Sequence, residues 1–401
     1  AAPGSIVMSY PTIKILPGED RRLRIGSPWL FSNELRMDAE AKALPPGGLV
    51  RVMAPSGKIM GVAQFNPHSL IAARLLTRNK DAQVDRPFVA RRVARALELR
   101  ERLFDTPHYR LVHAEADGLP GLVVDRYGDT LVAQLNTAGM SALEGPVAEA
   151  LDEMVRPRAI VARNDAPSRG LEGLASEVKA LKGEVGGQLE LVENGLTFVA
   201  DPAGGQKTGW FYDQRANRRF AAGLCRGEAV LDVYSYCGGF ALTAAAHGAK
   251  AVTAVDSSAA ALELAAASAE LQGSAGVCGF ERGEAFTFLD GAAQAKRRFG
   301  VVIADPPAFV KSRKDLGPGL KGYRKLARLC AALVTEPGFL CLGCCSHHVS
   351  AEQFTAECWA GIRDAGRGGR LIRTAGAGPD HPVHPALPET AYLKFLAFAL
   401  D

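Results

Sequence analysis

Three apolar segments in the second half of the chain each end in residues that can bind a ligand or react with one. Ligands bind outside the carboxyl ends of the strands in open α/β sheets, so we expect the three ends to meet over one pocket. A glycine-rich turn, a rigid acidic turn and a thiol at one pocket indicate methyl transfer from S-adenosylmethionine (SAM) to a base. The segments are 230–234 before Cys237-Gly238-Gly239, 301–304 before Asp305-Pro306-Pro307, and 340–343 before Cys344-Cys345-Ser346.

Cys345 is the candidate catalytic nucleophile. Carbon 5 of a pyrimidine is a poor nucleophile, but addition of a thiolate to carbon 6 lets carbon 5 attack a methyl group. Such a thiol needs a lowered pKa, which a basic neighbour would supply. A small buried hydrophobic residue is the alternative interpretation of any free cysteine. A zinc site on Cys341 and Cys344 would need a second pair of ligands, which the chain lacks, so no metal is expected.

The turn Asp305-Pro306-Pro307 is the candidate site for the base. Its prolines fix φ and remove N–H donors, so the turn is stiff and its carbonyl oxygens stay free. Asp305 would bond to N3 of a cytosine while the carbonyls of Pro306 and Pro307 receive the exocyclic amine. An ordinary strand terminator is the alternative. No second cysteine adjoins the turn, so water or another side chain is expected to take the carbon-5 proton.

The glycine-rich turn lacks both the GxGxxG dinucleotide motif and the GxxxxGK[ST] phosphate loop. We therefore expect Tyr234 and Gly238 to face an amino-acid moiety such as methionine. Asp232 is expected either to face the sulfonium end of the cofactor or to orient the loop. Asp305, at the same edge of the sheet, is a further candidate for cofactor contact.

Two more acids are candidates for the adenosine part of the cofactor. Asp256 ends the second strand, where a carboxylate commonly accepts hydrogen bonds from both ribose hydroxyls. The alternative for Asp256 is a helix N-cap. Glu284 follows the third strand and is predicted to receive the adenine amino group.

The spacing of apolar residues and turns predicts the elements that position these groups. Short strands broken by Pro-Gly and Ser-Gly turns predict a small β-barrel over residues 8–80. Residues 81–195 predict a linker helix and a central α+β domain of the order strand-strand-helix-strand-strand, whose last strand lies near Leu189–Val192. Over 196–401 strands alternate with alanine-rich helices, which is typical of an α/β, doubly wound, mostly parallel sheet.

Composition limits the partners and the compartment. The 401 residues are 47% hydrophobic, which allows two or three domains with large cores. The net charge is only +4, but residues 8–78 hold ten Lys and Arg against five acids. Such a basic module fits a polyanion, with Arg22 and Arg24 as candidate substrate contacts, or is simply a basic surface. All eight cysteines lie at or after Cys225, so we expect free thiols, no membrane partner and a cytoplasmic location.

The run Gly205-Gln206-Lys207-Thr208-Gly209-Trp210-Phe211-Tyr212-Asp213-Gln214-Arg215 resembles a signature of one enzyme family. This is the bacterial ribosomal RNA large subunit methyltransferase I type, 5-methylcytosine enzymes with an N-terminal PUA domain. The similarity runs from about residue 12 to the C-terminus. Further matching motifs are Asp117–Leu122 with Asp125–Gly128, Asn164-Asp165 with Arg169 and Glu172-Gly173, and Asp380–Val383.

The resemblance implies a PUA barrel, a small central domain and a Rossmann-like SAM methyltransferase domain. It also implies a cytosine of large-subunit ribosomal RNA as substrate and a homodimer. The family's thiol nucleophile maps onto Cys345, and its SAM-binding segment onto Lys207, Thr208, Asp213 and Arg215.

Some positions depart from the family pattern. Ala308 stands where relatives tend to have Lys, and Gly283-Glu284 stands where an Asp pair is usual. Because Cys344 precedes Cys345, a shift of one residue would exchange the nucleophile. An amino-group methyltransferase and a catalytically idle RNA-binding protein are the alternative functions.

Overall fold

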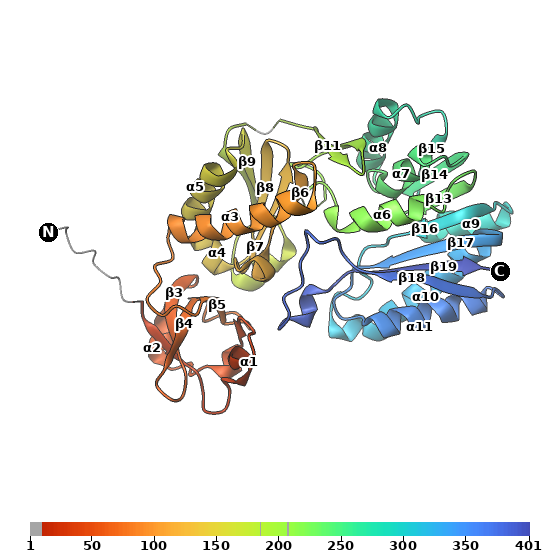
Figure 1. Ribbon diagram of the computed structural model, residues 1–401. Coiled ribbons are helices and arrows are strands. Elements are labelled where there is room, and N and C mark those ends of the chain that lie inside the picture. Colours follow the sequence, from red (N-terminus) through yellow and green to blue (C-terminus); the bar gives the residue numbers. More distant parts are fainter. Residues whose placement is uncertain (1–9, 185, 207) are drawn as a thin grey trace. The chain divides into compact units, whose positions relative to one another are not determined.

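The computed structural model describes residues 10–184, 186–206 and 208–401, which form two compact units (Figure 1). The first unit holds the described residues up to Gly187 together with Asp380–Thr390. The second holds Gln188–Pro379 and Ala391–Asp401. The chain therefore leaves the second unit once near its end and returns to it. In the described part of the chain, no helix is both long and apolar enough to cross a membrane.

The small β-barrel predicted at the N-terminus is confirmed. Its strands take the order β1-β3-β4-β5-β2, with β1 parallel to β3. Side chains of β3 alternate, so that Val50 and Val52 are buried, as expected for a strand with one face on a core. The elements are β1 Thr12–Lys14, α1 Arg21–Arg24, β2 Trp29–Leu30, α2 Ala39–Ala43, β3 Gly48–Met53, β4 Ile59–Phe65 and β5 Ala73–Thr77.

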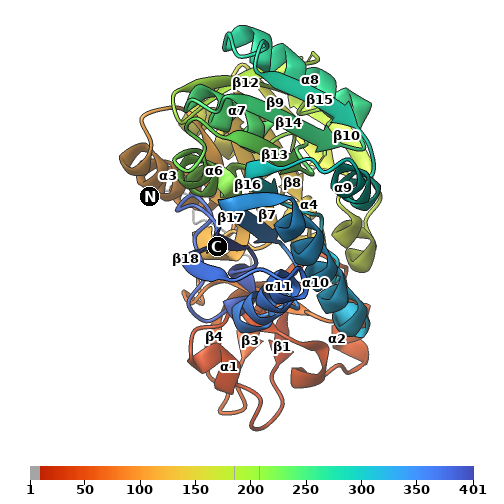
Figure 2. The same cartoon turned by 90° about the vertical axis from the view of Figure 1, so that its right-hand side faces the viewer.

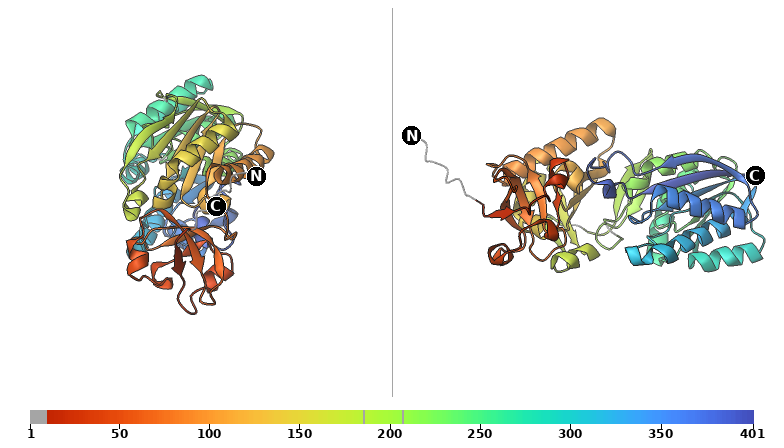
Figure 3. Two further views of the ribbon diagram at one scale, coloured as in Figure 1. Left: turned by 90° about the vertical axis from the view of Figure 1, so that its left-hand side faces the viewer. Right: turned by 90° about the horizontal axis from the view of Figure 1, so that it is seen from below.

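The central part of the first unit is a five-stranded sheet of order β10-β9-β8-β7-β6, with one core formed by its strands and by α3, α4 and α5. Asp85 caps α3 by accepting a hydrogen bond from the Phe88 amide. Figure 3 shows the barrel in red beside these yellow strands. The elements are α3 Arg86–Leu103, β6 His108–His113, β7 Leu122–Tyr127, β8 Thr130–Leu135, α4 Ala138–Ala142, α5 Glu144–Val155, β9 Ala159–Asn164 and β10 Glu177–Lys182.

The predicted order of this central domain is wrong in two respects. Three strands, not two, precede the helices, since the strand that residues 130–135 also predict is present as β8 and pairs with β7 before the chain turns into α4. The last strand of the sheet is Glu177–Lys182, paired with β9. The strand expected near Leu189–Val192 exists as β11 (Leu189–Glu193), but it pairs with β12 (Leu196–Ala200) in a separate hairpin.

Glu172 joins the barrel to the central sheet within the first unit. Its carboxylate accepts hydrogen bonds from Asn66 Nδ2 at 3.0 Å, Ser69 Oγ at 3.0 Å and Arg74 Nη1 at 2.9 Å. Burial alone would raise the pKa of Glu172, but Arg74 and these hydrogen bonds hold the pKa below its usual value. The Glu172-Gly173 motif therefore has a structural role.

Two arginines of the central domain pair with acids of the other sequence motifs. Arg100 is fully buried and forms a bidentate pair with Asp117, with both N–O distances 2.7 Å. Arg110 forms a second bidentate pair with Asp125. Asp380 accepts hydrogen bonds from both residues, through its carbonyl from Arg100 and through its carboxylate from the Arg110 amide. These contacts fix the Asp380–Thr390 segment in the first unit.

The second unit is built on a seven-stranded sheet of order β15-β14-β13-β16-β17-β19-β18. β19 runs antiparallel to β17 and β18, and the pairs from β15 to β17 are parallel. The predicted doubly wound α/β fold is confirmed. The strands are β13 Ala229–Val233, β14 Ala251–Asp256, β15 Cys278–Arg282, β16 Phe299–Ala304, β17 Val334–Cys344, β18 Gly369–Ala375 and β19 Lys394–Leu400.

Helices cover both faces of this sheet (Figure 2). On one face α9, α10 and α11 share a core with Leu231, Val302 and Leu340, and on the other α6 and α7 pack on Val230 and Ile303. The helices are α6 Arg215–Ala222, α7 Gly239–Ala246, α8 Ala259–Leu271, α9 Ala285–Gln294, α10 Leu316–Leu333 and α11 Ala351–Asp364.

Candidate functional site

The ends of β16 and β17 meet, as the sequence predicts. These strands are parallel neighbours, and Asp305 lies so close to Gly343 that a Cβ at residue 343 would stand 2.3 Å from Asp305 Oδ1. Two residues later, the half-buried Cys345 thiol lies 3.8 Å from the carbonyl oxygen of Pro306, its hydrogen-bond acceptor. The structure thus brings the acidic turn and this thiol together.

Ser346 holds the two loops in place. Its buried hydroxyl accepts a hydrogen bond from the Val310 amide at 3.2 Å, which fixes the chain after the Asp-Pro-Pro turn. The same oxygen is 2.7 Å from the Tyr323 hydroxyl on α10. The thiol is therefore flanked by residues that are hydrogen-bonded on both sides of the crevice.

Lys394 is a site residue that sequence reasoning missed. It begins β19, pairs with Cys344 in the sheet register, and donates to the carbonyls of Ser346 at 2.6 Å and Tyr392 at 2.8 Å. Burial lowers the pKa of Lys394, while negative charge on Cys344 and, second, on Cys345 would raise it. The Lys394 ammonium therefore lies close enough to interact with a negative charge on Cys345. Its position fifty residues along the chain gave no signal in the sequence.

The buried cysteines differ from Cys345. Cys344 is fully buried in the core shared with Leu342 and Phe354, whereas Cys345 is partly exposed. Burial raises the pKa of Cys225 and Cys237 to about 12, and it also raises the pKa of Cys330, Cys341 and Cys358. Those five thiols stay protonated and act as small apolar side chains. Within the described residues, no cluster of three or more His, Cys, Asp or Glu side chains could hold a metal ion.

The loop after β13 is strained and tightly packed. Tyr234 and Tyr236 have φ values of +63° and +51°, which side chains rarely adopt. Gly238 has φ +76°, and a Cβ there would lie 3.0 Å from Ala265 Cβ, closer than an ordinary contact. Backbone strain of this kind occurs at ligand sites, where the surrounding structure enforces it.

Asp232 is buried beneath this loop and orients it. Its Oδ2 accepts hydrogen bonds from Ser235 Oγ at 2.7 Å and the Ala241 amide at 3.0 Å. Burial, and less strongly the charges of Asp305 and Asp256, raise the pKa of Asp232 to about 7. Oδ1 is buried and has no hydrogen-bond partner among the described residues. A carboxylate with one unsatisfied oxygen fits a cofactor that carries a cationic ammonium and sulfonium.

Asp256 and Glu284 both bind local backbone. Asp256 accepts from the amides of Tyr236 at 2.8 Å and Ser258 at 2.9 Å, so it links the loop after β13 to the start of α8. The N-cap of α8 is Ser258, whose hydroxyl accepts a hydrogen bond from the Ala261 amide. Glu284 is exposed and caps α9 by accepting from the Thr287 amide at 2.8 Å. Contact of either acid with the cofactor stays a prediction.

The Gly-Gln-Lys-Thr-Gly segment lies against the same loop through Tyr236. The Tyr236 hydroxyl accepts from the Gln206 amide at 3.0 Å and donates to the Gly209 carbonyl at 3.3 Å. Thr208 is fully buried. Lys207, the predicted cofactor ligand between them, lies outside the described residues.

Glu193 on β11 anchors the end of this segment. Its buried carboxylate pairs with Arg218 at 2.5 Å and accepts from Trp210 Nε1 at 3.0 Å. Arg215 Nε lies 3.8 Å from the same carboxylate. Arg218 also packs on Gly239, where a Cβ would lie 2.5 Å from Arg218 Nε. Much of the signature thus serves to hold the loop after β13.

Asp213 fixes the chain that leaves and re-enters the second unit. Its carbonyl accepts from the Gly378 amide at 3.1 Å, and its Oδ2 accepts from the Tyr392 hydroxyl at 2.5 Å. Gly378 and Tyr392 stand just before and just after the segment that belongs to the first unit. The predicted role of Asp213 in cofactor binding stays a prediction beside this observed one.

Arg22 and Arg24, the predicted substrate contacts, lie on α1 of the barrel. Arg22 pairs with Glu34 at 3.1 Å, and its guanidinium lies over the Phe31 ring. Arg24 lies 3.3 Å from Asp20, and both arginine side chains are largely exposed, so they are accessible to a polyanion.

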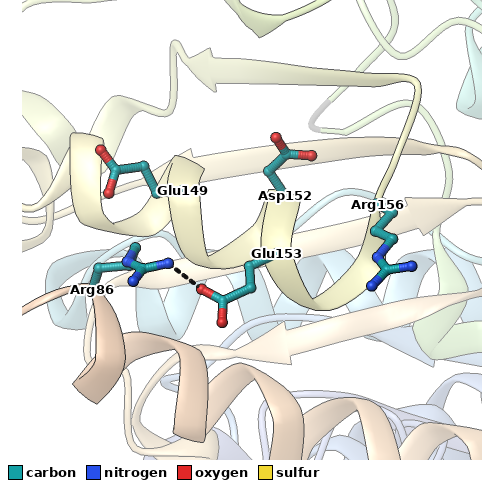
Figure 4. Close-up of a pocket in the computed structure, with 5 residues that line it drawn as sticks. All are labelled: Arg86, Glu149, Asp152, Glu153 and Arg156. Carbon is teal, nitrogen blue, oxygen red and sulfur yellow. Dashed lines mark hydrogen bonds and ion pairs between the residues drawn. The ribbon is translucent and has the colours of Figure 1, made fainter.

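A surface hollow of about 520 Å³ lies on α3 and α5. None of the residues predicted to bind the cofactor or the RNA lines it. Figure 4 shows Arg86 and Glu153 pointing toward each other across it, in an ion pair of 2.5 Å. Alternating charges that neutralise each other indicate an ordinary solvated surface.

Comparison with known proteins decides the family. Residues 13–78 match the sequence model of the PUA-like domain, and residues 173–393 match that of the S-adenosylmethionine-dependent methyltransferases. The ribosomal RNA large subunit methyltransferase I of Shewanella denitrificans is 34% identical over 96% of this chain and 98% of its own length. That of Pseudoalteromonas atlantica is 32% identical with the same coverage. The chain belongs to the ribosomal RNA large subunit methyltransferase I family.

Solved structures agree with this fold. A SAM-dependent methyltransferase from Streptococcus mutans superposes with a TM-score of 0.82 at 20% identity, covering 97% of this chain and all of the other. A methyltransferase complexed with S-adenosylhomocysteine gives a TM-score of 0.83 at 19% identity, covering 98% and 100%. The cofactor of this family member is S-adenosylmethionine, and Asp232 with the loop after β13 is the part of the site that fits it.

Proposed function

We propose that this family member methylates carbon 5 of a cytosine in large-subunit ribosomal RNA, with Cys345 as the nucleophile. The relatives' names support the class of RNA. The observation that supports the base and the mechanism is the accessible Cys345 thiol 3.8 Å from the Pro306 carbonyl, beside the Asp305 carboxylate. An amino-group methyltransferase would not need that thiol. Work on ribosomal RNA would place the enzyme in the cytoplasm.

In this mechanism the target cytosine is flipped out of its stack and held by the rigid Asp305-Pro306-Pro307 turn. The Cys345 thiolate adds to carbon 6, which makes carbon 5 electron-rich. When bound, S-adenosylmethionine supplies the electrophilic methyl group. Loss of the carbon-5 proton to water or a side chain then lets the C–S bond break, and Cys345 leaves as a thiolate.

Each protein group has one task in this scheme. Asp305 hydrogen-bonds the ring and polarises it, and the Pro306 carbonyl accepts from the exocyclic amine. Lys394 favours the thiolate through its positive charge, and Ser346 holds both loops. The Arg22 and Arg24 side chains of the barrel contact RNA phosphates.

The proposal also covers the domain boundaries and the assembly. It divides the chain into domains at 8–80, 81–195 and 196–401, and it takes the enzyme to be a homodimer.

A trapped covalent adduct tests the mechanism. RNA that carries 5-fluorocytosine cannot lose the carbon-5 substituent as a proton, so the thioether to the nucleophile should persist on a denaturing gel. We expect the adduct with the wild type and with Cys344→Ala, and none with Cys345→Ala. An adduct that survives Cys345→Ala, or that is lost only in Cys344→Ala, would refute the assignment. Bisulfite sequencing of ribosomal RNA from cells with and without the protein tests the product.

A further inference from the structure

The chain that follows the Asp-Pro-Pro turn carries a strongly basic surface that has no role in the scheme above. Residues 311–328 contain seven Lys and Arg and one acid, Asp315. All seven basic side chains are exposed. Within the described parts of the chain, Lys311, Arg313, Lys314 and Lys321 form no ion pair. Four cations without an acidic partner in one short segment fit a polyanion.

An aromatic hollow of about 400 Å³ lies at the start of this surface. Phe286 and Phe309 line it with ring centroids 6.2 Å apart, and Lys311, Asp315 and the first turns of α10 complete it. Gly322 makes room for Phe309, since a Cβ there would lie 3.1 Å from the Phe309 ring. Phe309 and Phe286 are each partly exposed, and Lys325 Nζ lies 4.7 Å from the centroid of the Phe286 ring.

The hollow and the proposed base site are linked by a short stretch of chain. Phe309 stands four residues after Asp305, and the next residue, Val310, is hydrogen-bonded to Ser346 beside Cys345. Phe309 also packs on Tyr323 of α10, with ring centroids 4.7 Å apart. The helix that holds Phe309 thus also carries Lys321. This short connection places the hollow where a nucleotide next to the target base is taken to lie in the inference below.

Accessible aromatic rings next to lysines that have no acidic partner are the combination that binds single-stranded nucleic acid. The rings stack on bases without sequence preference, and the cations follow the phosphates. From these observations we propose that Phe286 and Phe309 form a stacking site for the nucleotide next to the target base, and that Lys311, Arg313 and Lys314 bind the phosphates of that strand. This inference rests on the proposed function, because it takes the target base to lie at Asp305.

The experiment measures binding of a fluorescent single-stranded oligocytidylate by anisotropy, and of SAM by calorimetry, with the full chain. Phe309→Ala should weaken RNA binding about five- to a hundredfold, the loss of one stacked base, and leave the SAM affinity unchanged. The triple variant Lys311→Ala, Arg313→Ala, Lys314→Ala should reduce the slope of log Kd against log salt by about two. Its matched control is Lys250→Ala, Lys296→Ala, Arg298→Ala, which removes the same charges from exposed positions before β14 and β16.

Three results would overturn the inference. Phe309→Ala could weaken SAM binding, which would assign the hollow to the cofactor's adenine. The triple variant could match its control in salt slope, or the oligocytidylate could fail to bind the wild type. If ribosomal RNA is still methylated in those cases, only this inference fails. If the wild type binds the oligocytidylate as expected but traps no 5-fluorocytosine adduct, the proposed mechanism fails. The RNA-binding role of this surface is then still supported.

Discussion

The Lys394 ammonium donates a hydrogen bond of 2.6 Å to the carbonyl of Ser346, the residue that follows Cys345. It also pairs in register with Cys344. One buried cation therefore contacts the loop that carries the proposed nucleophile. A chain of contacts thus joins the last strand of the sheet to the reactive thiol.

Lys394→Met should slow alkylation of Cys345. Removing the cation withdraws a charge that favours the thiolate, so reaction with iodoacetamide at pH 7 should fall roughly three- to tenfold. The pH profile of alkylation should move to higher pH, which a purely structural role for Lys394 would not cause. Mass spectrometry of the Cys345 peptide gives the rate. Lys250→Met, an exposed lysine of the same unit, is the control, and an unchanged profile in Lys394→Met would refute the coupling.

Asp232 should make SAM binding depend on pH. Its pKa of about 7 means that it is mostly protonated at pH 6 and mostly ionised at pH 7.5. The ionised form attracts a cationic ligand, so SAM affinity should rise several-fold between these pH values. Asp232→Asn should bind more weakly at pH 7.5 and show a flat profile by calorimetry. Equal pH dependence in the variant would show that another group is responsible.

The same residue should affect the stability of the ligand-free protein. The pKa of Asp232 is raised on folding, from 3.8 to about 7, so its favourable contribution is complete below pH 3.8 and is lost as pH rises through 7. Asp232→Asn should therefore become more stable relative to the wild type as pH increases from 4 to 8. Urea unfolding at these two pH values measures the difference. A difference that is constant with pH would contradict the assigned shift.

His113 should have the opposite effect in the first unit. Burial, followed by the charge of Arg110, lowers the pKa of His113 from 6.5 to about 2. Its contribution to folding is present above pH 6.5 and is lost as pH falls toward 2, at up to about 1.4 kcal/mol per pH unit. His113→Gln should reduce the loss of stability between pH 7 and 5 by about 2 kcal/mol. Equal loss of stability in His113→Gln and the wild type over this pH range would contradict the assigned shift.

Glu193→Ala should strongly destabilise the second unit. It leaves the buried Arg218 guanidinium without its carboxylate and removes the acceptor of Trp210, at a cost of about 3–5 kcal/mol. Thermal unfolding followed by circular dichroism measures the change. Asp364→Ala removes the partner of Arg324 in an exposed pair and should change stability little. Equal effects of the two variants would mean that Glu193 is not the anchor of the signature segment.

The elements of the second unit were largely predictable because their signals are local. Val230 and Val233 precede a glycine turn, and Val301 to Ala304 precede Asp305, so strand ends and turn residues coincide in the sequence. The carboxyl ends of parallel neighbours meet at one edge, which is why Asp305 and Cys345 were expected together. The strand near Leu189 was also predicted, but its pairing with β12 was not. Alternation of apolar and polar residues indicates a strand, but it does not indicate which strand will be its neighbour.

The sequence by itself determined the family, the strand ends and the reactive residue types, since these depend on neighbours in the chain. Tertiary structure alone decided which charges surround them. Insertion of β19 between β17 and β18 carries Lys394 to Cys344, and the β11–β12 hairpin carries Glu193 to Arg218. Burial raises the pKa of Asp232 to about 7. Burial and pairing between distant segments set such properties, and no local pattern encodes either one.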